Sequence, residues 1–210
     1  MKTSPVLLAA LLFFAACTSQ PAAENKYTAS ESVPAEVPVD PHFKAFIGKF
    51  RMVQLPLTIK FTSPADYENL PYLQGADSNY IKSSYIGGDG VVNVYAYGLL
   101  PDTVNNYKII WLEPAEDFLP ILTTLTKKGV PIAEEYMGVG GCGPDCCFDC
   151  NETVIVNKDL SIYSADSIKE CNCDDNGPDT TTMRNYARVK TARIGADGNF
   201  KFTEIKEVKY

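Results

Sequence analysis

The chain has 210 residues, of which 45% are apolar and 21% are charged, and its formal net charge is -7. This composition is typical of a folded globular protein and excludes a collagen-like, intrinsically disordered or polytopic membrane chain. The negative charge argues against nucleic acid as a partner, because proteins that bind the phosphate backbone need clustered Lys and Arg residues. Seven cysteines, with fourteen glycines and fourteen prolines, indicate a loop-rich fold that cysteines hold together.

An apolar segment from Val6 to Ala16 follows Lys2 at the amino terminus. Its length of about a dozen residues is too short to span a ~30 Å hydrocarbon core, so residues 1–16 are predicted to be a signal peptide. The segment ends in Ala15-Ala16-Cys17, which resembles the lipobox of bacterial lipoproteins. The resemblance implies that cleavage leaves Cys17 as the first residue, acylated on its sulfur and amine, with palmitate among the acyl chains.

The lipobox resemblance also implies where the protein sits. Two or three acyl chains attach a protein to the lipid bilayer almost permanently, so Cys17 is the predicted membrane anchor. Thr18 and not Asp follows Cys17, and by the same resemblance this does not signal retention in the inner membrane. We therefore expect a lipid-anchored protein of the bacterial cell envelope, in the outer membrane. The alternatives are a signal peptide that is cut elsewhere, or a Cys17 that forms a disulfide.

Residues 17–40 are predicted to form a disordered tether. Small and polar residues dominate this segment, three prolines interrupt it, and its apolar residues follow neither a helical nor a strand period. The remaining residues, 41–210, are numerous enough for a single domain with a substantial core.

The sequence of residues 41–210 predicts a mainly β fold, an antiparallel hairpin meander that is sandwich-like or barrel-like, with little helix. Tyr, Val, Ile, Thr and Phe alternate with polar residues in short runs that Gly, Asn or Asp residues separate. One helical turn is expected near 114–118, followed by a strand, because Pro120 would interrupt a longer helix. The expected strands are 49–61, 91–98 and 106–113, followed by hairpins that turn at 127–129, 157–159 and 196–199.

The order of these features resembles that of uncharacterised small lipoproteins of Bacteroidetes-type bacteria. The shared features are the lipobox and tether, Leu55-Pro56 in an early strand, the Tyr95–Gly98 strand, a Lys-Lys-Gly hairpin, a cysteine- and glycine-rich linker, and a closing hairpin at Asp197–Phe200. This resemblance implies a location and a fold class, and it implies no activity.

Six cysteines follow Cys17, and we predict that all six form disulfides, as is usual in an oxidising compartment. The predicted hairpin that turns at 157–159 brings two groups of cysteines to one of its ends. We therefore expect at least one bond between the groups, and the sequence does not choose among the pairings. The first group is Cys142, Cys146, Cys147 and Cys150, and the second, expected in another loop, is Cys171 and Cys173.

Two other interpretations of the cysteines remain open. Cys147 and Cys150 form a C-x-x-C motif, which in redox enzymes lies at the start of a helix that stabilises the thiolate. Here a predicted strand follows the motif, and the neighbouring Asp145 and Asp149 would raise the pKa of a thiol. The spacing of the two groups also resembles a zinc site, which an oxidising compartment disfavours.

Acidic residues crowd the same region, with nine of them and two lysines between residues 142 and 179. Asp174, Asn176 and Asp179 offer oxygen ligands at spacings that resemble a calcium loop. The position at which an EF-hand loop carries a bidentate Glu is Asn185, so this is not an EF-hand. The main interpretation is a solvated acidic loop, and loose Ca²⁺ capture is the alternative.

The sequence contains none of the common catalytic or cofactor-binding motifs, so no catalytic residue and no cofactor are predicted. His42, the single histidine, is expected on the surface beside the tether. The favoured function is a non-enzymatic binding or structural module that meets a protein or glycan partner. The tyrosines that could line such a site are more often core residues at strand spacing; they are Tyr67, Tyr72, Tyr80, Tyr85, Tyr95 and Tyr97.

The alternative function is an envelope hydrolase that uses paired carboxylates with split pKa values. In this sequence Glu134 with Glu135, or Glu116 with Asp117, would have to converge in a cleft. Adjacent residues of a strand point to opposite faces of the sheet, so we expect each pair to be separated or solvated.

Overall fold

The computed structural model describes residues 40–60, 67, 69–83, 85–86, 93–115, 118–140, 142–143 and 145–209. The chain divides into two units, Met1–Val37 and Pro38–Tyr210, and every described residue belongs to the second. The predicted signal peptide, the lipidation site Cys17 and all of the predicted tether except Asp40 therefore lie outside the described residues. Among the described residues, no helix has the length and apolarity needed to cross a bilayer.

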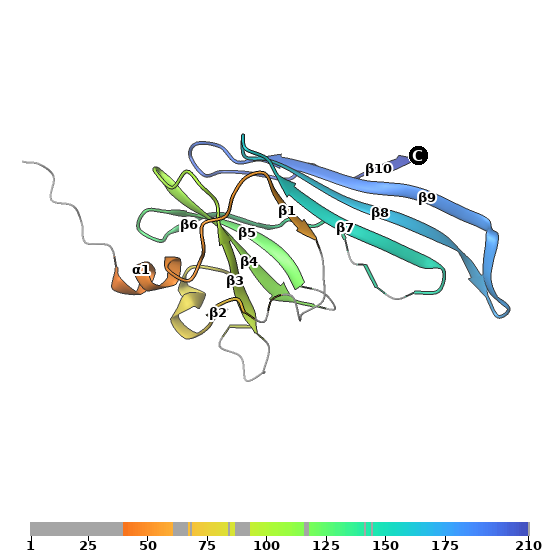
Figure 1. Cartoon of the computed structure of the whole chain (residues 1–210), viewed down its shortest axis with the longest axis horizontal. Coiled ribbons are helices and arrows are strands. Elements are labelled where there is room, and N and C mark those ends of the chain that lie inside the picture. The colour runs from red at the N-terminus through yellow and green to blue at the C-terminus, as the bar shows by residue number, and fades with distance from the viewer. Residues whose placement is uncertain are drawn as a thin grey trace, which may run out of the picture. The chain divides into compact units, whose positions relative to one another are not determined.

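Two antiparallel sheets of five strands each confirm the mainly β prediction, and neither sheet closes into a barrel (Figure 1). The first sheet has the order β2-β3-β4-β5-β6 and comprises Tyr72–Leu73, Val94–Leu99, Asn106–Pro114, Phe118–Thr126 and Pro131–Tyr136. The second sheet has the order β1-β7-β8-β9-β10 and comprises Leu57–Lys60, Phe148–Val156, Ser161–Asp174, Gly177–Arg193 and Lys206–Lys209.

Three of the predicted turns are present. Gly129, at the β5–β6 turn, has a φ of 84°, a backbone conformation that residues other than glycine rarely adopt. At the β7–β8 turn, the Asp159 carboxylate accepts hydrogen bonds from the N–H and hydroxyl of Ser161. The turn before β10 contains Gly198, whose φ is 88°.

Cys171 and Cys173 lie in β8 and not in a loop, which corrects the expectation for this segment. β8 pairs with β9 as far as Asp174, opposite Gly177, and the sequence analysis did not anticipate this hairpin. The outer half of β8 shows no apolar alternation that would mark it as a strand. Strand pairing with β9 and disulfides hold it instead, and it projects beyond the end of the first sheet (Figure 1).

The structure also corrects two expectations about helices. The helical turn expected near 114–118 is absent from the described residues, because β4 continues to Pro114 and pairs with Phe118 at the start of β5. A helix that was not anticipated, α1, spans Pro41–Ile47. Asp40, assigned above to the tether, caps this helix by accepting a hydrogen bond from the His42 N–H at 2.9 Å.

The predicted strand 49–61 is split between the two sheets. Met52 forms a parallel bridge with Leu99 of β3 in the first sheet, and β1 then pairs with β7 in the second sheet. The chain changes sheets at Leu55–Pro56, where the peptide bond is cis.

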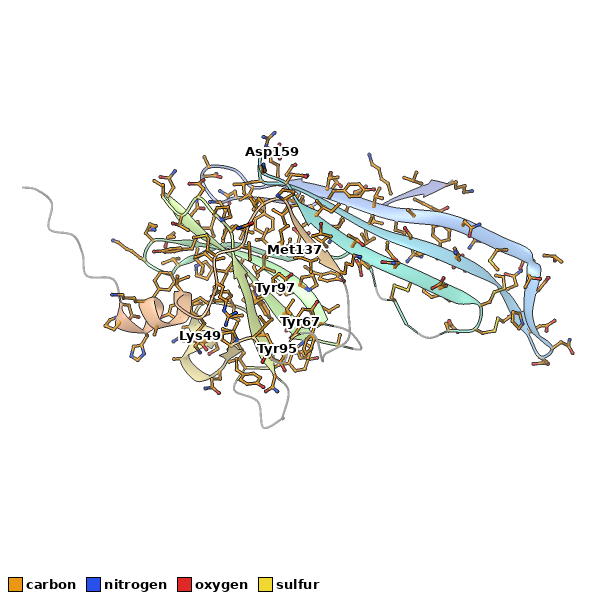
Figure 2. All side chains as sticks on the ribbon, in the orientation of Figure 1. Lys49, Tyr67, Tyr95, Tyr97, Met137 and Asp159 are labelled. Carbon is orange, nitrogen blue, oxygen red and sulfur yellow. A yellow bond between two sulfur atoms is a disulfide. The ribbon has the colours of Figure 1, made fainter. Side chains whose placement is uncertain are left out.

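Apolar side chains fill both faces of the first sheet. On one face, Phe43 and Phe46 of α1 pack with Trp111 of β4 and with residues next to η2 (Gly75–Asn79). On the other face, residues of both sheets form a common core that includes Ile110, Val154 and Met137. Figure 2 shows Met137 between the two sheets. The first sheet is therefore the middle of three layers.

Candidate functional site

The most unusual polar group in the structure is a pair of buried carboxylates, Glu152 and Asp166. These residues lie directly opposite each other on β7 and β8. Glu152 is 4% exposed and Asp166 is fully buried. Arg188 continues the same row on β9. Glu152, Asp166 and Arg188 thus form one row across three strands of the second sheet. The apolar core between the sheets ends at this row, and the two acids of the row point inward.

The segment that covers the carboxylate pair is residues 137–143, which we call the strap; residue 141 lies outside the described residues. The strap leads from β6 towards β7. The backbone N–H groups of Val139 and Gly140 both donate to one oxygen of Glu152, the latter at 3.3 Å. The Tyr136 hydroxyl contacts the other oxygen at 3.3 Å. Glu152 thus fastens the strap to the second sheet.

A glycine makes this contact possible. A Cβ atom at Gly138 would collide with the Tyr136 hydroxyl and with a Glu152 carboxylate oxygen. At Gly140, a Cβ atom would meet only Arg188 Nη1, at 3.8 Å. The close approach of strap and carboxylate therefore depends on Gly138 and not on Gly140.

The environment of the pair favours protonation. Burial raises the pKa of the Glu152 carboxyl to about 7, although the N–H donors of the strap oppose this shift, and the neighbouring Asp166 raises the pKa further. Burial also raises the pKa of the Asp166 carboxyl, against the lowering effects of Arg188 and the Asn151 backbone. Burial and the nearby Glu152 raise the pKa of the Tyr136 hydroxyl.

Lys190 of β9 is a further charged residue near Glu152 and Tyr136. Its ammonium group donates to the Tyr136 carbonyl at 2.8 Å and lies 4.3 Å from the centre of the Phe202 ring. Burial lowers the pKa of Lys190, and the nearby Glu135 and Glu152 oppose this effect. Lys190 therefore ties the end of β6 to the second sheet.

The six cysteines beyond Cys17 form three disulfides, as predicted. Cys142 pairs with Cys150, Cys146 with Cys173, and Cys147 with Cys171, with Cα–Cα distances of 5.7, 6.3 and 5.3 Å. Two of the bonds join the first group of cysteines to the second, which confirms the expected linkage. The C-x-x-C cysteines Cys147 and Cys150 have different partners, so they do not form a redox pair with each other.

One cluster of the described residues has the geometry to hold a metal ion. Sγ of Cys142, Sγ of Cys150 and a carboxylate oxygen of Asp166 all lie within 4.8 Å of one another. In the disulfide the two sulfurs are not thiolates, which are the form of cysteine that binds metals. This cluster could therefore hold a soft divalent ion only after reduction of the disulfide.

The calcium candidates lie at and near the β8–β9 turn. Asp174 accepts a hydrogen bond from the Asn176 N–H, and Asp179 accepts two from Thr181. These side chains are exposed. Among the described residues, no three carboxylates of this hairpin converge within 4.8 Å. The structure therefore assigns turn-stabilising roles to Asp174 and Asp179.

Of the carboxylates named for a hydrolase, Glu134 and Glu135 do not converge. Glu134 accepts from the Thr123 hydroxyl at 2.6 Å and from the Lys82 N–H at 3.1 Å. Glu135 accepts from the Phe202 N–H at 3.3 Å, as expected for neighbours that point to opposite faces of a strand. Glu116 and Asp117 lie outside the described residues. His42 is exposed in the first turn of α1, as predicted.

The tyrosines divide between core and surface. Tyr67, Tyr80 and Tyr95 are buried, Tyr97 is half-buried, and Tyr72 and Tyr85 are exposed. Tyr67, Tyr95 and Tyr97 pack in one group, and Figure 2 shows them close together. In this group the Tyr67 and Tyr97 rings are 6.1 Å apart in an edge-to-face arrangement. These rings therefore pack with one another and do not form an open aromatic platform.

A hollow of about 410 Å³ lies on the α1 side of the first sheet, away from the carboxylate pair. Among the described residues, its lining is Phe43, Lys44, Ile47 and Tyr107, with no carboxylate. The described lining therefore does not supply the paired carboxylates that the hydrolase interpretation requires.

Comparison with known proteins gives no relative from which a function could be transferred. No protein-family model matches the chain, no curated protein matches it, and no solved structure matches it. The interpretation of the site therefore rests on its own geometry.

The sequence analysis did not single out Glu152 and Asp166. The predicted hairpin began at Glu152 and ended at Ser164, two residues before Asp166. In the structure both acids continue the inward-facing alternation of Val154 and Ser164, which was the available signal. A polar residue at an inward position is informative because buried charges need partners. The pairing of the two acids depends on the register of the two strands, which could not be predicted from the sequence to within one residue.

Proposed function

We propose that the protein is a non-enzymatic module of the bacterial cell envelope, anchored in the outer membrane by acyl chains on Cys17. In this proposal, the three-layer body binds a protein or glycan partner. The non-enzymatic part of this proposal rests on one observation, which is that the two paired carboxylates, Glu152 and Asp166, are covered. Glu152 is engaged by two backbone N–H groups and a tyrosine hydroxyl, and Asp166 is fully buried. Because the described residues of the strap cover this pair, a substrate would have to displace them to reach Glu152.

The position of the β8–β9 hairpin supports a presenting role for the body. α1 begins directly after the predicted tether, and the β8–β9 turn lies at the opposite end of the unit Pro38–Tyr210 (Figure 1). The hairpin end is acidic and exposed at Asp174, Asp175 and Asp179. A partner with a basic surface would match this charge.

Anchoring is tested by replacing Cys17 with Ser in the full-length protein. We expect the natural chain to fractionate with membranes and to incorporate a labelled fatty acid. The Cys17→Ser variant should lose the label, and it should be released or remain as an uncleaved precursor. A Cys17→Ser variant that matures and stays in the membrane like the natural protein would exclude the lipid anchor.

Partner binding is tested by photo-crosslinking in intact cells. A photoreactive residue at Asn176, in the β8–β9 turn, should give a discrete adduct that weakens as salt concentration rises. The control places the same residue at Lys158, in the turn at the other end of β8, where no adduct is expected. Equal adducts at both positions, or none at Asn176, would contradict binding through the hairpin end.

The envelope hydrolase remains a second candidate because of one observation. Glu152 has a pKa of about 7 and faces a second acid, Asp166, which is a combination that general acid catalysis uses. Release of sugar reducing ends from purified cell-wall glycan by the protein, abolished in Glu152→Gln, would support the hydrolase. We expect no release from either form.

A further inference from the structure

We propose that the Cys146–Cys173 disulfide accepts two electrons by exchange with the dithiol of a partner protein, and that the dithiol lies on a basic surface of that partner. The reaction opens this bond, oxidises the two thiols of the partner and leaves the other two disulfides closed. This activity goes beyond the proposed binding function, and it does not depend on the acyl anchor at Cys17.

Exposure sets this disulfide apart from the other two. Cys146 and Cys173 are both exposed, whereas all four cysteines of the other two bonds are half-buried. Cys173 also lies in the outer half of β8, which projects beyond the first sheet (Figure 1). A thiolate must approach a disulfide sulfur directly in order to attack it, so the rate of exchange depends on access. Of the three disulfides, Cys146–Cys173 is therefore the one that a large partner reaches most readily.

Hydrogen bonds hold Cys146 in place without the disulfide. Cys146 lies in a turn in which the Phe148 N–H donates to the Asp145 carbonyl at 3.3 Å, and its own N–H donates to the Asp145 carboxylate at 2.7 Å. The next residue, Cys147, is attached to β8 by its bond to Cys171, and its carbonyl accepts from the Cys171 N–H at 3.0 Å. Opening of the exposed bond therefore leaves Cys146 in its turn beside β8.

Strand pairing holds Cys173 in the same way. Cys173 lies opposite Pro178 of β9, and its neighbours Asn172 and Asp174 are also paired with β9. Its position therefore does not depend on the disulfide either. The two thiols that reduction produces stay within reach of each other, so a disulfide of the partner can close the bond again by the reverse steps.

Acidic side chains flank the exposed disulfide. Asp145 precedes Cys146, Asp174 follows Cys173, and both acids are exposed. This negative charge repels a thiolate that approaches on an acidic surface, and it attracts one that approaches on a basic surface. Charge therefore selects among dithiols that have the same chemical reactivity.

Cations of the adjoining strands do not cancel this charge. Lys169 stands opposite Asp149 in the pairing of β7 with β8, and Arg184 forms an ion pair with Glu170. Each of these cations is thus matched by an acid of its own. The preferred partner therefore carries Lys or Arg residues next to its dithiol.

The exchange balances as a two-electron reaction. A thiol of the partner loses its proton to solvent, attacks Cys173 Sγ and forms a mixed disulfide, while the Cys146–Cys173 bond breaks and Cys146 leaves as a thiolate. The second thiol of the partner loses its proton and attacks the partner's sulfur in the mixed disulfide, which releases Cys173 as a thiolate. Both cysteine thiolates take protons from solvent. The dithiol is oxidised to a disulfide, and the two cysteines are reduced.

The order of reduction tests the site itself. The natural protein is purified with its disulfides intact, any thiol that is free at the start is blocked, and limiting dithiothreitol is added. We expect alkylation and peptide mapping to show Cys146 and Cys173 labelled first, with the other two disulfides still closed. Earlier or simultaneous opening of either other bond would overturn the proposal. Because blocking also removes an unacylated Cys17 from the result, a failure of the anchor and a failure of the exchange site are distinguished.

The charge of the dithiol tests the choice of partner. Two synthetic peptides carry the same C-x-x-C dithiol, and one is rich in lysine while the other is rich in glutamate. At low salt the lysine-rich peptide should open the bond about tenfold faster or more, which is the lower end of the effect of electrostatic attraction on association. Rising salt should reduce the difference. Equal rates at low salt, or a faster glutamate-rich peptide, would overturn the proposal.

Variants at the flanking acids connect this charge effect to the site. Asp145→Asn keeps the side-chain oxygen that accepts from the Cys146 N–H, and Asp174→Asn keeps the oxygen that accepts from the Asn176 N–H. The double variant should lower the advantage of the lysine-rich peptide from about tenfold to about threefold. The matched control, Glu204→Gln at an exposed position before β10, should keep the full advantage.

An unchanged advantage in the double variant, or an equal loss in the control, would overturn the role of the flanking acids and with it the basic partner. Where the double variant does not fold, the order of opening and the comparison of the two peptides on the natural protein still decide.

Discussion

Glu152 and Asp166 face each other across β7 and β8, and both carboxyls are buried beneath the strap. Like charges directly opposite each other destabilise a sheet, and burial adds the cost of removing each charge from water. Protonation relieves both effects. The hydrogen bonds from the strap to Glu152 then hold the two sheets together at the edge of the core. Stability and strap position should therefore depend on pH and on the residues that touch this pair.

The first prediction concerns pH. Glu152 has a pKa of about 7 in the folded protein against an ordinary value of 4.5. The folded protein therefore binds the proton more tightly between these pH values, so the free energy of unfolding should fall as pH rises through this window. The fall attributable to Glu152 is on the order of 2 to 3 kcal/mol. Asp166, whose pKa is also raised, adds an effect of the same sign.

Denaturant unfolding at about pH 5 and about pH 8, with the disulfides intact, measures this dependence. Glu152→Gln keeps acceptor and donor groups at the position and should remove most of the Glu152 part. The control is Glu204→Gln at an exposed position. Equal pH dependence in the natural protein and Glu152→Gln would show that Glu152 does not titrate in this window.

The second prediction ranks the disulfides. Cys147–Cys171 closes a loop with a sequence separation of 24, and Cys142–Cys150 one with a separation of 8. Loop entropy predicts contributions of about 3.5 and about 2.6 kcal/mol, so the paired Ala variant at Cys147 and Cys171 should unfold at the lower temperature. Thermal unfolding of both double variants tests this order. The reverse order would show that native contacts and not loop length decide.

The third prediction uses two neighbouring glycines. Gly138→Ala places a methyl group against Tyr136 and Glu152, and should destabilise the protein by about 1 to 3 kcal/mol. Gly140→Ala meets only Arg188 Nη1 at 3.8 Å and should change stability by less than about 0.5 kcal/mol. Urea unfolding of both variants measures the difference. Equal effects would contradict the close contact between strap and carboxylate.

The fourth prediction concerns α1. Phe46 is 1% exposed and its ring lies 4.8 Å from that of Tyr80 and 5.2 Å from that of Phe50. Phe46→Ala should therefore cost about 3 to 5 kcal/mol. Lys44→Ala, at an exposed position of the same helix, is the control and should be nearly neutral. A Phe46→Ala protein as stable as the control would show that α1 is not part of the folded core.

Local signals in the sequence predicted most of the first sheet. β4, β5 and β6 carry the alternation and turn residues that define hairpins, and Gly129 lies where the turn needs a positive φ. The helix α1 was missed although Asp40 and Pro41 form a common helix start, because it follows a segment that was assigned to the tether. The outer half of β8 was missed because its side chains are polar on both faces, and its strand conformation depends on β9 and on cysteines far along the chain.

The sequence by itself determined the mainly β class and the association of the two cysteine groups, since alternation, turn residues and cysteine positions are local properties. The disulfide pairing, the division of residues 51–60 between two sheets and the encounter of Glu152 with Asp166 were decided only by the tertiary structure. Each of these depends on strand register, and a shift of one residue in either β7 or β8 would turn the carboxyl of that strand to the opposite face. Register is fixed by the packing of the two sheets around their common core, which no local segment encodes alone.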